Sequence, residues 1–289
     1  MASPRVHPQL IDALARTPHL DVTDAAALAA HQSQPRPHPG VTCQMHPYPG
    51  GYLRIHHSTT TANAAAAVLL FHGGGYLTGS PFSLDPLCGM LAARLGVPII
   101  AASYRLAPQH HYPAQRDDAV AALHAACQAV GVEPQRIIIG GQSAGAGLAA
   151  RTTHHLAATG QPLPAAQWLW YPMLDPHTTA TADYPVWTAR DNEYAWKALL
   201  GPTSPAVMTA ELRAHPSLPQ TYLVVGDADL FYAEDRAYAQ QLAAAGVPVE
   251  LDIIPGGVHD CDNVAPQAPV VVAAMERAVA WLVGCLGQA

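Results

Sequence analysis

The sequence predicts an α/β protein with one mostly parallel, doubly wound sheet. Its 289 residues, half of them apolar, are enough to bury the core of one large domain. Three consecutive isoleucines at 137–139 indicate a strand buried on both faces, which is typical of a parallel sheet between helices. Strand-like and helix-like segments also alternate along most of the chain, and this alternation requires crossover connections between parallel strands.

The first part of the chain is expected to lie at the edge of this sheet. Residues 1–40 contain helix-forming segments and end in a proline-rich stretch. They predict either a surface appendage or the N-terminal part of a helical cap. Residues 41–46 and 52–57, separated by a Pro-Gly-Gly turn, predict an antiparallel hairpin.

The following segments give the alternating part of the fold. Together with the hairpin, the predicted strands number eight. We expect strands at 65–71, 97–104, 137–139, 167–171, 221–226 and 249–254, and helices at 85–95, 113–130, 148–158, 232–245 and 268–286.

One segment is too long for an ordinary connection between strands. Residues 174–219 carry Trp187, Tyr194 and Trp196, and we expect them to fold as helices over the sheet edge. The predicted organisation is a cap made of residues 1–40 and the insertion 175–219, and a catalytic domain over 41–289.

Composition excludes several classes of protein. The net charge is −7, with one lysine and thirteen scattered arginines, so no basic surface for nucleic acid is expected. No uninterrupted apolar stretch reaches the roughly 18–20 residues of a membrane span, and the N-terminus lacks an apolar signal core. We therefore expect a cytoplasmic protein. The apolar stretch 268–286 is either a core helix or the face of a homodimer.

The cysteines and histidines do not predict a metal site. Five widely spaced cysteines without a C-x-x-C pair favour a reducing compartment over a disulfide framework. Many of the sixteen histidines come as adjacent doublets, whose side chains point apart on a helix or strand. We expect neither a metal nor a cofactor.

A Gly-x-Ser-x-Gly pattern follows the isoleucine strand. Gly141, Gln142, Ser143, Ala144 and Gly145 lie between this strand and a helix-forming segment. Strand, sharp turn and helix are the context of a nucleophile elbow, which exposes the serine hydroxyl. A glycine-containing loop without chemistry would carry the same short pattern, so the rest of the chain decides.

A second glycine-rich turn follows the strand at 65–71. His72 and three glycines end that strand, and glycines let backbone N–H groups approach a ligand. The alternative is a flexible loop. We expect the N–H groups of Gly74, Gly75 and Ala144 to form an oxyanion hole.

The acid and the base of a catalytic triad come later in the chain. Asp227 and Asp229 both follow the strand at 221–226, where α/β sheets place functional groups, although either could instead cap the next helix. His259 lies in a glycine-rich loop after the last strand. The chain order Ser, Asp, His is that of α/β-type serine hydrolases.

These motifs together resemble the hormone-sensitive lipase family of α/β-hydrolase esterases, the bacterial type IV carboxylesterases. The resemblance covers roughly residues 65–285. It rests on the motifs His72–Tyr76, Tyr104–Pro108, Gly141–Gly145, Tyr171–Asp175, Asp229–Asp235 and Gly256–His259.

The resemblance implies an α/β-hydrolase fold with a small helical cap, and it selects Asp229 as the triad acid, with Asp227 in support. The implied activity is that of a serine carboxylesterase for short- to medium-chain acyl esters, working through an acyl-enzyme. A non-catalytic small-ligand receptor and an amidase or peptidase on the same fold are the alternatives. The substrate is expected to contact His72, Tyr76, Gln142, Leu230 and Trp187.

The chain departs from the family pattern at three places. Gln142 and Gln109 replace an Asp and a Glu, and we expect the two amides to lie close together behind the elbow. After the histidine, Asp260 and Cys261 replace Gly-Phe. An acid beside His259 should favour the protonated imidazole, and the missing Phe should reshape the pocket wall.

Overall fold

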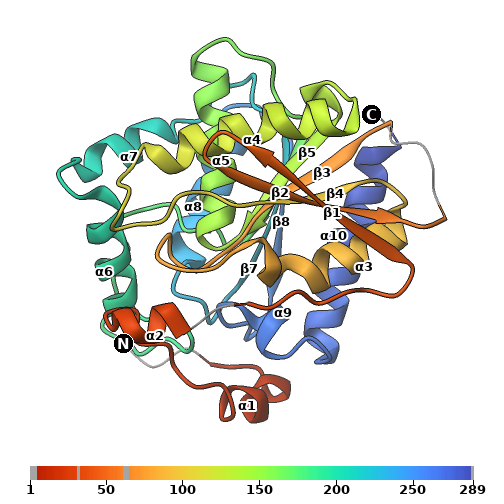
Figure 1. Ribbon diagram of the computed structural model, residues 1–289. Coiled ribbons are helices and arrows are strands. Elements are labelled where there is room, and N and C mark those ends of the chain that lie inside the picture. The colour runs from red at the N-terminus through yellow and green to blue at the C-terminus, as the bar shows by residue number, and fades with distance from the viewer. Residues whose placement is uncertain (1–4, 31–32, 61–64, 288–289) are drawn as a thin grey trace.

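A computed structural model describes residues 5–30, 33–60 and 65–287, and it contains one eight-stranded sheet (Figure 1). The spatial order of the strands is β1-β2-β4-β3-β5-β6-β7-β8. β1 and β2, and β2 and β4, pair antiparallel, and every other neighbouring pair is parallel. The predicted mostly parallel α/β sheet with an edge hairpin is confirmed. The strands are β1 (Val41–Tyr48), β2 (Gly51–Ser58), β3 (Ala67–Phe71), β4 (Ile99–Ala102), β5 (Ile137–Gln142), β6 (Ala166–Trp170), β7 (Gln220–Gly226) and β8 (Val249–Ile254).

Helices cover both faces of the sheet (Figure 1). α4 and α5 pack together on one side, and α3 and α10 lie on the other, where Arg94 and Glu276 join them by an ion pair. The central strands β3, β5 and β6 are buried along their whole length, as their continuous apolar runs predict. The main helices are α3 (Asp85–Leu95), α4 (Ala114–Val130), α5 (Ala144–Ala158), α8 (Tyr232–Ala244) and α10 (Pro269–Leu286).

Four further helices lie in the segments predicted to form a cap. They are α1 (Pro8–Leu14), α2 (Ala25–Ala30), α6 (Ala189–Leu200) and α7 (Pro205–Glu211). The two segments meet where His19 lies 3.5 Å from Asp191, near the start of α6. Thr188 and Asp191 begin α6 with a reciprocal capping box, so this helix has a fixed first turn.

α10 is long and apolar enough, by length and composition alone, to cross a membrane. In the structure it packs against β7 and β8, and Val271, Ala278 and Leu282 are buried. Its apolar run is interrupted by Glu276 and Arg277, which pair with charged groups at the surface. These contacts are those of a helix packed on a sheet.

Four loops follow the carboxyl ends of parallel strands and bring the chemistry together. They follow β3, β5, β7 and β8 and carry the predicted oxyanion glycines, Ser143, the two aspartates and His259, respectively. α5 begins at Ala144, directly after Ser143, and not at residue 148 as its composition suggested. The short helix α9 (Cys261–Val264), which the sequence did not predict, begins two residues after His259.

Candidate active site

The structure brings Ser143, His259 and Asp229 into one continuous hydrogen-bonded chain. Ser143 Oγ lies 2.9 Å from His259 Nε2, and His259 Nδ1 lies 2.9 Å from Asp229 Oδ2. All three side chains are buried, with 6 % of Ser143, 4 % of His259 and 1 % of Asp229 exposed. The arrangement is that of a nucleophile, a base and a group that orients the base.

The elbow around Ser143 explains why glycines flank it. Ser143 has φ +53° and ψ −120°, a strained conformation that tight packing must hold. A Cβ on Gly145 would lie 2.1 Å from the carbonyl oxygen of Phe71, and one on Gly141 would lie 2.4 Å from the same atom. Only glycine fits at either place, because the turn passes directly against the end of β3.

The two aspartates after β7 have different partners. Asp229 Oδ2 contacts His259, and its Oδ1 accepts from the backbone N–H of Phe231 at 2.9 Å. Asp227 instead accepts from the backbone N–H of Gly256 at 2.6 Å. Asp227 therefore fixes the loop that leads to His259, and Asp229 contacts the imidazole itself.

The glycine loop after β3 offers free backbone donors next to Ser143. A Cβ on Gly73 would lie 3.4 Å from Ser143 Cβ, so the loop passes close to the serine. Gly74 and Gly75 have positive φ values of 108° and 60°, and within the described residues their N–H groups have no hydrogen-bond acceptor. Ala144 is the first residue of α5, where helical N–H groups are also free.

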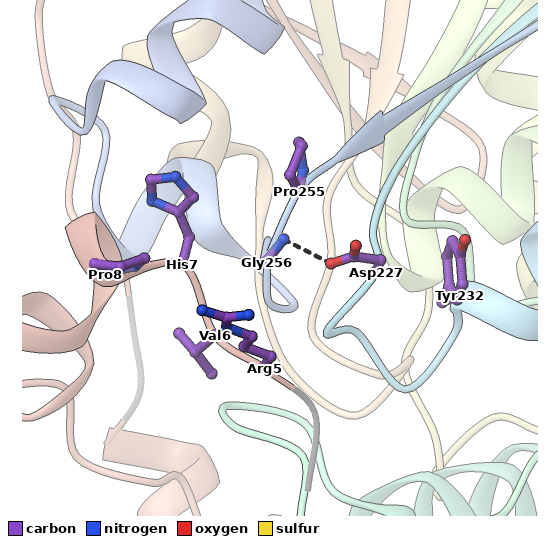
Figure 2. A pocket seen from close by; sticks show the side chains of 8 residues that line it. All are labelled: Arg5, Val6, His7, Pro8, Asp227, Tyr232, Pro255 and Gly256. Carbon is purple, nitrogen blue, oxygen red and sulfur yellow. Dashed lines mark hydrogen bonds between the residues drawn. The ribbon is translucent and has the colours of Figure 1, made fainter.

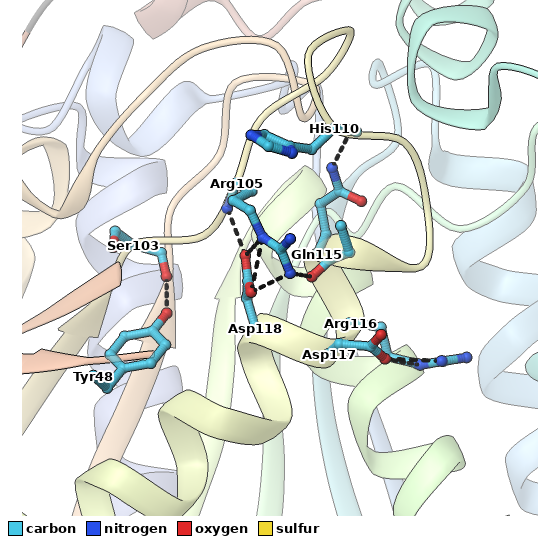
Figure 3. Close-up of polar contacts among 9 residues, drawn as sticks. Tyr48, Ser103, Arg105, His110, Gln115, Arg116, Asp117 and Asp118 are labelled. Carbon is cyan, nitrogen blue, oxygen red and sulfur yellow. Dashed lines mark hydrogen bonds and ion pairs between the residues drawn. The ribbon is translucent and has the colours of Figure 1, made fainter. Parts of the chain in front are cut away.

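The motif Tyr104–Pro108 supports this loop from behind. Tyr104 Oη donates to the carbonyl of His72 at 2.7 Å, and its ring stacks on the His72 imidazole with centroids 4.3 Å apart. Arg105 forms a forked ion pair with Asp118 of α4, with a closest contact of 2.7 Å (Figure 3). These bonds fix the residues that follow β4, and through Tyr104 they fix the start of the oxyanion loop.

The residues predicted to contact the substrate differ in their place: Trp187 lies near the imidazole of His259, and the others are buried. His72 and Tyr76 are buried below the glycine loop, and burial lowers the pKa of His72 to about 4, so this imidazole is neutral. Leu230 is buried beside Asp229. Trp187 lies at the reacting side: its ring is 6.2 Å from that of His259, and a Cβ on Gly75 would lie 2.3 Å from it.

Trp187 is held in place by its neighbours in residues 185–192. Val186, the residue before it, has φ +69°, which is strained for a β-branched residue. At this turn the backbone N–H of Trp187 donates to the carbonyl of Pro185 at 2.8 Å. The indole nitrogen lies 3.4 Å from Asn192 Oδ1 in α6. The indole is therefore fixed close to both Gly75 and His259.

The expected pairing of Gln142 with Gln109 is wrong. Gln109 is exposed, whereas Gln142 is buried and donates through Nε2 to Asp262 Oδ2 in α9. Asp262 also accepts from the hydroxyl of Tyr171. Neither Asp262 nor Tyr171 is among the site residues predicted from the sequence. The only local signal was the pair of acids, Asp260 and Asp262, directly after the histidine.

His259 lies in an environment that favours its protonated form, as predicted for an acid beside it. Burial lowers the pKa of His259, but the charge and hydrogen bond of Asp229, together with Asp260 and Asp262, raise it above the ordinary 6.5. The imidazole is enclosed by the rings of Tyr171 at 4.8 Å and Phe231 at 5.0 Å. The site can therefore stabilise the imidazolium that a proton transfer creates.

Two surface cavities lie outside this group of residues. One, of about 530 Å³, is lined by residues 5–8 and by Asp227, Tyr232, Pro255 and Gly256 (Figure 2). The other, of about 440 Å³, lies between residues 19–21 and 180–191. Neither is lined by Ser143 or His259. Among the described residues, no three His, Cys, Asp or Glu side chains are grouped as metal ligands.

The fold and this geometry define an α/β hydrolase with a serine, histidine and aspartate at the ends of its strands. The family model for the alpha/beta hydrolase fold matches residues 68–263. The chain is 35 % identical over 206 residues to the ethyl acetate hydrolase of Pseudomonas putida, an alignment covering 65 % of this chain and 64 % of that protein.

Solved structures agree along nearly the whole chain. A bacterial heroin esterase has a TM-score of 0.87 and 31 % identity, with 98 % of each chain covered. An esterase from the bacterial hormone-sensitive lipase family has a TM-score of 0.81 and 26 % identity, with 99 % of this chain and 100 % of the other covered. The chain belongs to the hormone-sensitive lipase family of α/β hydrolases and is a carboxylic ester hydrolase.

Proposed function

We propose that the protein hydrolyses short- to medium-chain acyl esters, with Ser143 as nucleophile, His259 as base and Asp229 as its orienting acid. The observation that carries this proposal is the unbroken chain of 2.9 Å contacts from Ser143 through His259 to Asp229. The contact with Asp229 favours the tautomer in which Nδ1 carries the proton and Nε2 is free to accept one.

The reaction proceeds in two half-reactions. Ser143 Oγ attacks the ester carbonyl while His259 Nε2 takes its proton, and the N–H groups of Gly74, Gly75 and Ala144 stabilise the resulting oxyanion. The imidazolium then gives its proton to the leaving alcohol, which leaves an acyl group on Ser143. Water, deprotonated by His259, attacks the acyl-enzyme, and collapse of the second tetrahedral intermediate restores the serine hydroxyl.

The cap limits the size of the acyl group. Trp187 lies against Gly75 and near His259, so it occupies space that a long acyl chain would need. The Pseudomonas putida relative is named for ethyl acetate, whose acyl group has two carbons. Both observations support a preference for short acyl groups, and the place of Trp187 supports a role for residues 175–219 as part of a cap over the site.

A series of p-nitrophenyl esters from acetyl to decanoyl tests the substrate class. We expect kcat/KM to be highest for the short members and to fall steeply beyond hexanoyl, and Trp187→Ala should move the preference to longer chains. A wild-type preference for decanoyl would refute the assignment of acyl size. Matching p-nitroanilides separate an esterase from an amidase.

Covalent labelling tests the nucleophile separately. A fluorophosphonate should label the wild-type protein at Ser143 and leave Ser143→Ala unlabelled. Ser143→Ala should also lose several orders of magnitude in kcat while keeping its thermal unfolding midpoint. A protein that binds esters without labelling or turnover would be a receptor on the same fold.

We also propose a cytoplasmic location. All five cysteines are free, and Cys43 is exposed, which suits a reducing compartment. Fractionation of the native cells with an antibody to the protein tests this, and recovery in the extracellular fraction would contradict it.

A further inference from the structure

A side-chain hydrogen bond joins the strand of the nucleophile to the loop of the base. Gln142, the residue before Ser143, donates through Nε2 to Asp262 Oδ2, three residues after His259. Gln142 is buried and Asp262 half-buried. The two residues are 120 positions apart in the sequence, so this bond fixes the distance between the two loops that carry Ser143 and His259.

The other oxygen of Asp262 ties in a third element. Tyr171, directly after β6, donates its hydroxyl to Asp262 Oδ1, and the hydroxyl also lies 3.4 Å from Asp260 Oδ1. Tyr171 has φ +38°, a conformation unusual for a residue with a side chain, and its ring packs edge-on against His259. Asp262 therefore holds the ring that forms one wall of the imidazole site.

We propose that Asp262 is a positioning residue for His259: it holds the imidazole through Tyr171, ties it to the nucleophile strand through Gln142, and adds its own carboxylate to those of Asp229 and Asp260 near the ring. This inference deepens the proposed function and rests on it. Asp262 touches no reacting atom, so its effect passes through His259.

The charges around His259 give this arrangement a measurable consequence. The titratable groups that face the imidazole or its neighbours are Asp229, Asp260, Asp262, Tyr171 and Cys261. Burial raises the pKa of both Tyr171 and Cys261 well above their ordinary values, so both stay neutral. The negative charge that favours the imidazolium therefore comes from the three aspartates.

Asp260 and Asp262 form a pair that holds its protons more tightly than isolated carboxyls do. Burial raises the pKa of Asp262, and the neighbouring Asp260 raises it further; the hydrogen bonds from Tyr171 and Gln142 oppose this. Burial also raises the pKa of Asp260. The two carboxyls therefore lose their protons at a pH closer to neutral than isolated carboxyls do. In this pH range His259 must also lose its proton to act as a base.

Asp262→Asn removes the charge and keeps the hydrogen-bonding shape. The new amide oxygen can accept from Tyr171, and its NH₂ group can donate to the Gln142 amide once that amide is flipped. Wherever Asp262 is ionised, its replacement removes one negative charge near the imidazole, so the pKa of His259 should fall and the neutral, active base should persist to lower pH. We expect the acid limb of kcat/KM to move down by about 0.5 pH unit.

Gln142→Glu does the reverse: it sets two carboxylates face to face and removes the donor. Like charges at this distance repel unless a proton is shared, so we expect kcat to fall about tenfold, with a steeper loss as pH rises. The double variant Gln142→Glu/Asp262→Asn restores one donor and one acceptor, with the carboxylate moved beside the nucleophile. It should recover kcat to within about threefold of the wild type.

The measurements are kcat and kcat/KM for p-nitrophenyl acetate from pH 5 to pH 8.5, with thermal unfolding of each variant. Asp117→Asn, which removes the same charge from the exposed surface of α4, is the control and should leave the profile unchanged. An acid limb for Asp262→Asn that coincides with the wild type refutes the electrostatic role. A double variant no more active than Gln142→Glu refutes the linking role.

Fluorophosphonate labelling separates this inference from the proposed function. If the wild type is labelled at Ser143 and its acid limb does not respond to Asp262, only the inference fails. If the wild type is not labelled, the proposed nucleophile itself is wrong. If a single variant does not fold, Tyr171→Phe supplies the second test: it keeps the ring, removes the donor to Asp262, and should shift the acid limb and lower kcat.

Discussion

Replacing Arg151 by methionine should loosen the cap and lower the stability of the whole chain. Arg151 lies in α5, about two turns beyond the nucleophile elbow, and is completely buried. Its guanidinium donates to the carbonyl oxygens of Met208 in α7 and Leu174, and it lies 5.5 Å over the ring of Trp196 in α6. One side chain therefore fixes three points of the segment 174–219 to the helix behind Ser143.

The expected loss follows from these contacts. Methionine fills a similar volume but leaves two buried carbonyl oxygens without their charged donor, at a cost of about 1–3 kcal/mol each. The contact with Trp196 contributes about 1–2 kcal/mol more. Removing a buried charge also relieves a desolvation cost of several kcal/mol, which offsets part of the loss. We expect a net loss of about 3 kcal/mol, or about 6 °C in Tm for a chain of this size.

Thermal unfolding and ester kinetics together check this prediction. Because the cap carries Trp187, KM should rise more than kcat falls. The control is Arg277→Met, which removes an ion pair to Asp252 at 2.8 Å from a side chain that is 48 % exposed. Such a surface pair contributes about 0–1 kcal/mol, so its Tm should move by no more than about 2 °C. If Arg151→Met unfolds within the same 2 °C and keeps its KM, the anchoring role is refuted.

Three further predictions concern the triad and the elbow. Asp229→Asn should lower kcat by about 10³–10⁴-fold. Asp227→Asn should lower kcat less than about tenfold, because the Asp227 carboxylate bonds the backbone N–H of Gly256 and not the imidazole. Equal losses of kcat in steady-state assays would contradict the assignment of the triad acid. Burial lowers the pKa of His259, but Asp229 and the neighbouring acids raise it above 6.5. Because His259 must be neutral to act as a base, kcat/KM should fall as pH drops through a midpoint above 6.5. A midpoint below 6.5 would contradict the electrostatics. Gly145→Ala places a Cβ 2.1 Å from the carbonyl oxygen of Phe71 and should cost about 3 kcal/mol or more, measured by denaturant unfolding, with near-normal stability as the contradicting result.

The central strands were predictable because each is a short, largely apolar run, and the edge hairpin was predictable from the Pro-Gly-Gly turn between its strands. The prediction failed mainly at the ends of elements. Residues 97–104 were expected as one strand, but only Ile99–Ala102 pair in the sheet. Tyr104 lies outside the strand, and its side chain bonds the carbonyl of His72, a partner that no local pattern reveals.

The choice between the two aspartates illustrates what strand patterns cannot supply. Both Asp227 and Asp229 follow β7, and their composition permits the same roles. The backbone turns between them, where the N–H of Asp229 donates to the carbonyl of Gly226, and this turn directs one carboxylate to Gly256 and the other to His259. The family resemblance selected Asp229, and the structure brings that residue to the imidazole.

The pairing of the two glutamines failed for a related reason. Both replace acids of the family pattern, so a shared location was a natural hypothesis. Gln142 is the last residue of β5, however, and its amide bonds Asp262 in α9, whereas Gln109 lies in an exposed loop after β4. The replacement of two acids by amides indicates that the surroundings of both side chains differ from those in the family. It does not identify which atoms each side chain contacts.

The supporting contacts share one feature that bears on function. The loops at the carboxyl edge of the sheet are fixed by side chains that bond backbone groups: Tyr104 holds the carbonyl of His72, Asp227 holds the N–H of Gly256, and Asp229 holds the N–H of Phe231. In the part of the chain that the structure describes, the N–H groups of Gly74 and Gly75 meet no acceptor, so they remain available to a substrate. Changes at these supporting residues should therefore alter rate before they alter the fold, since the central strands are held by their own ladders and by a buried apolar core.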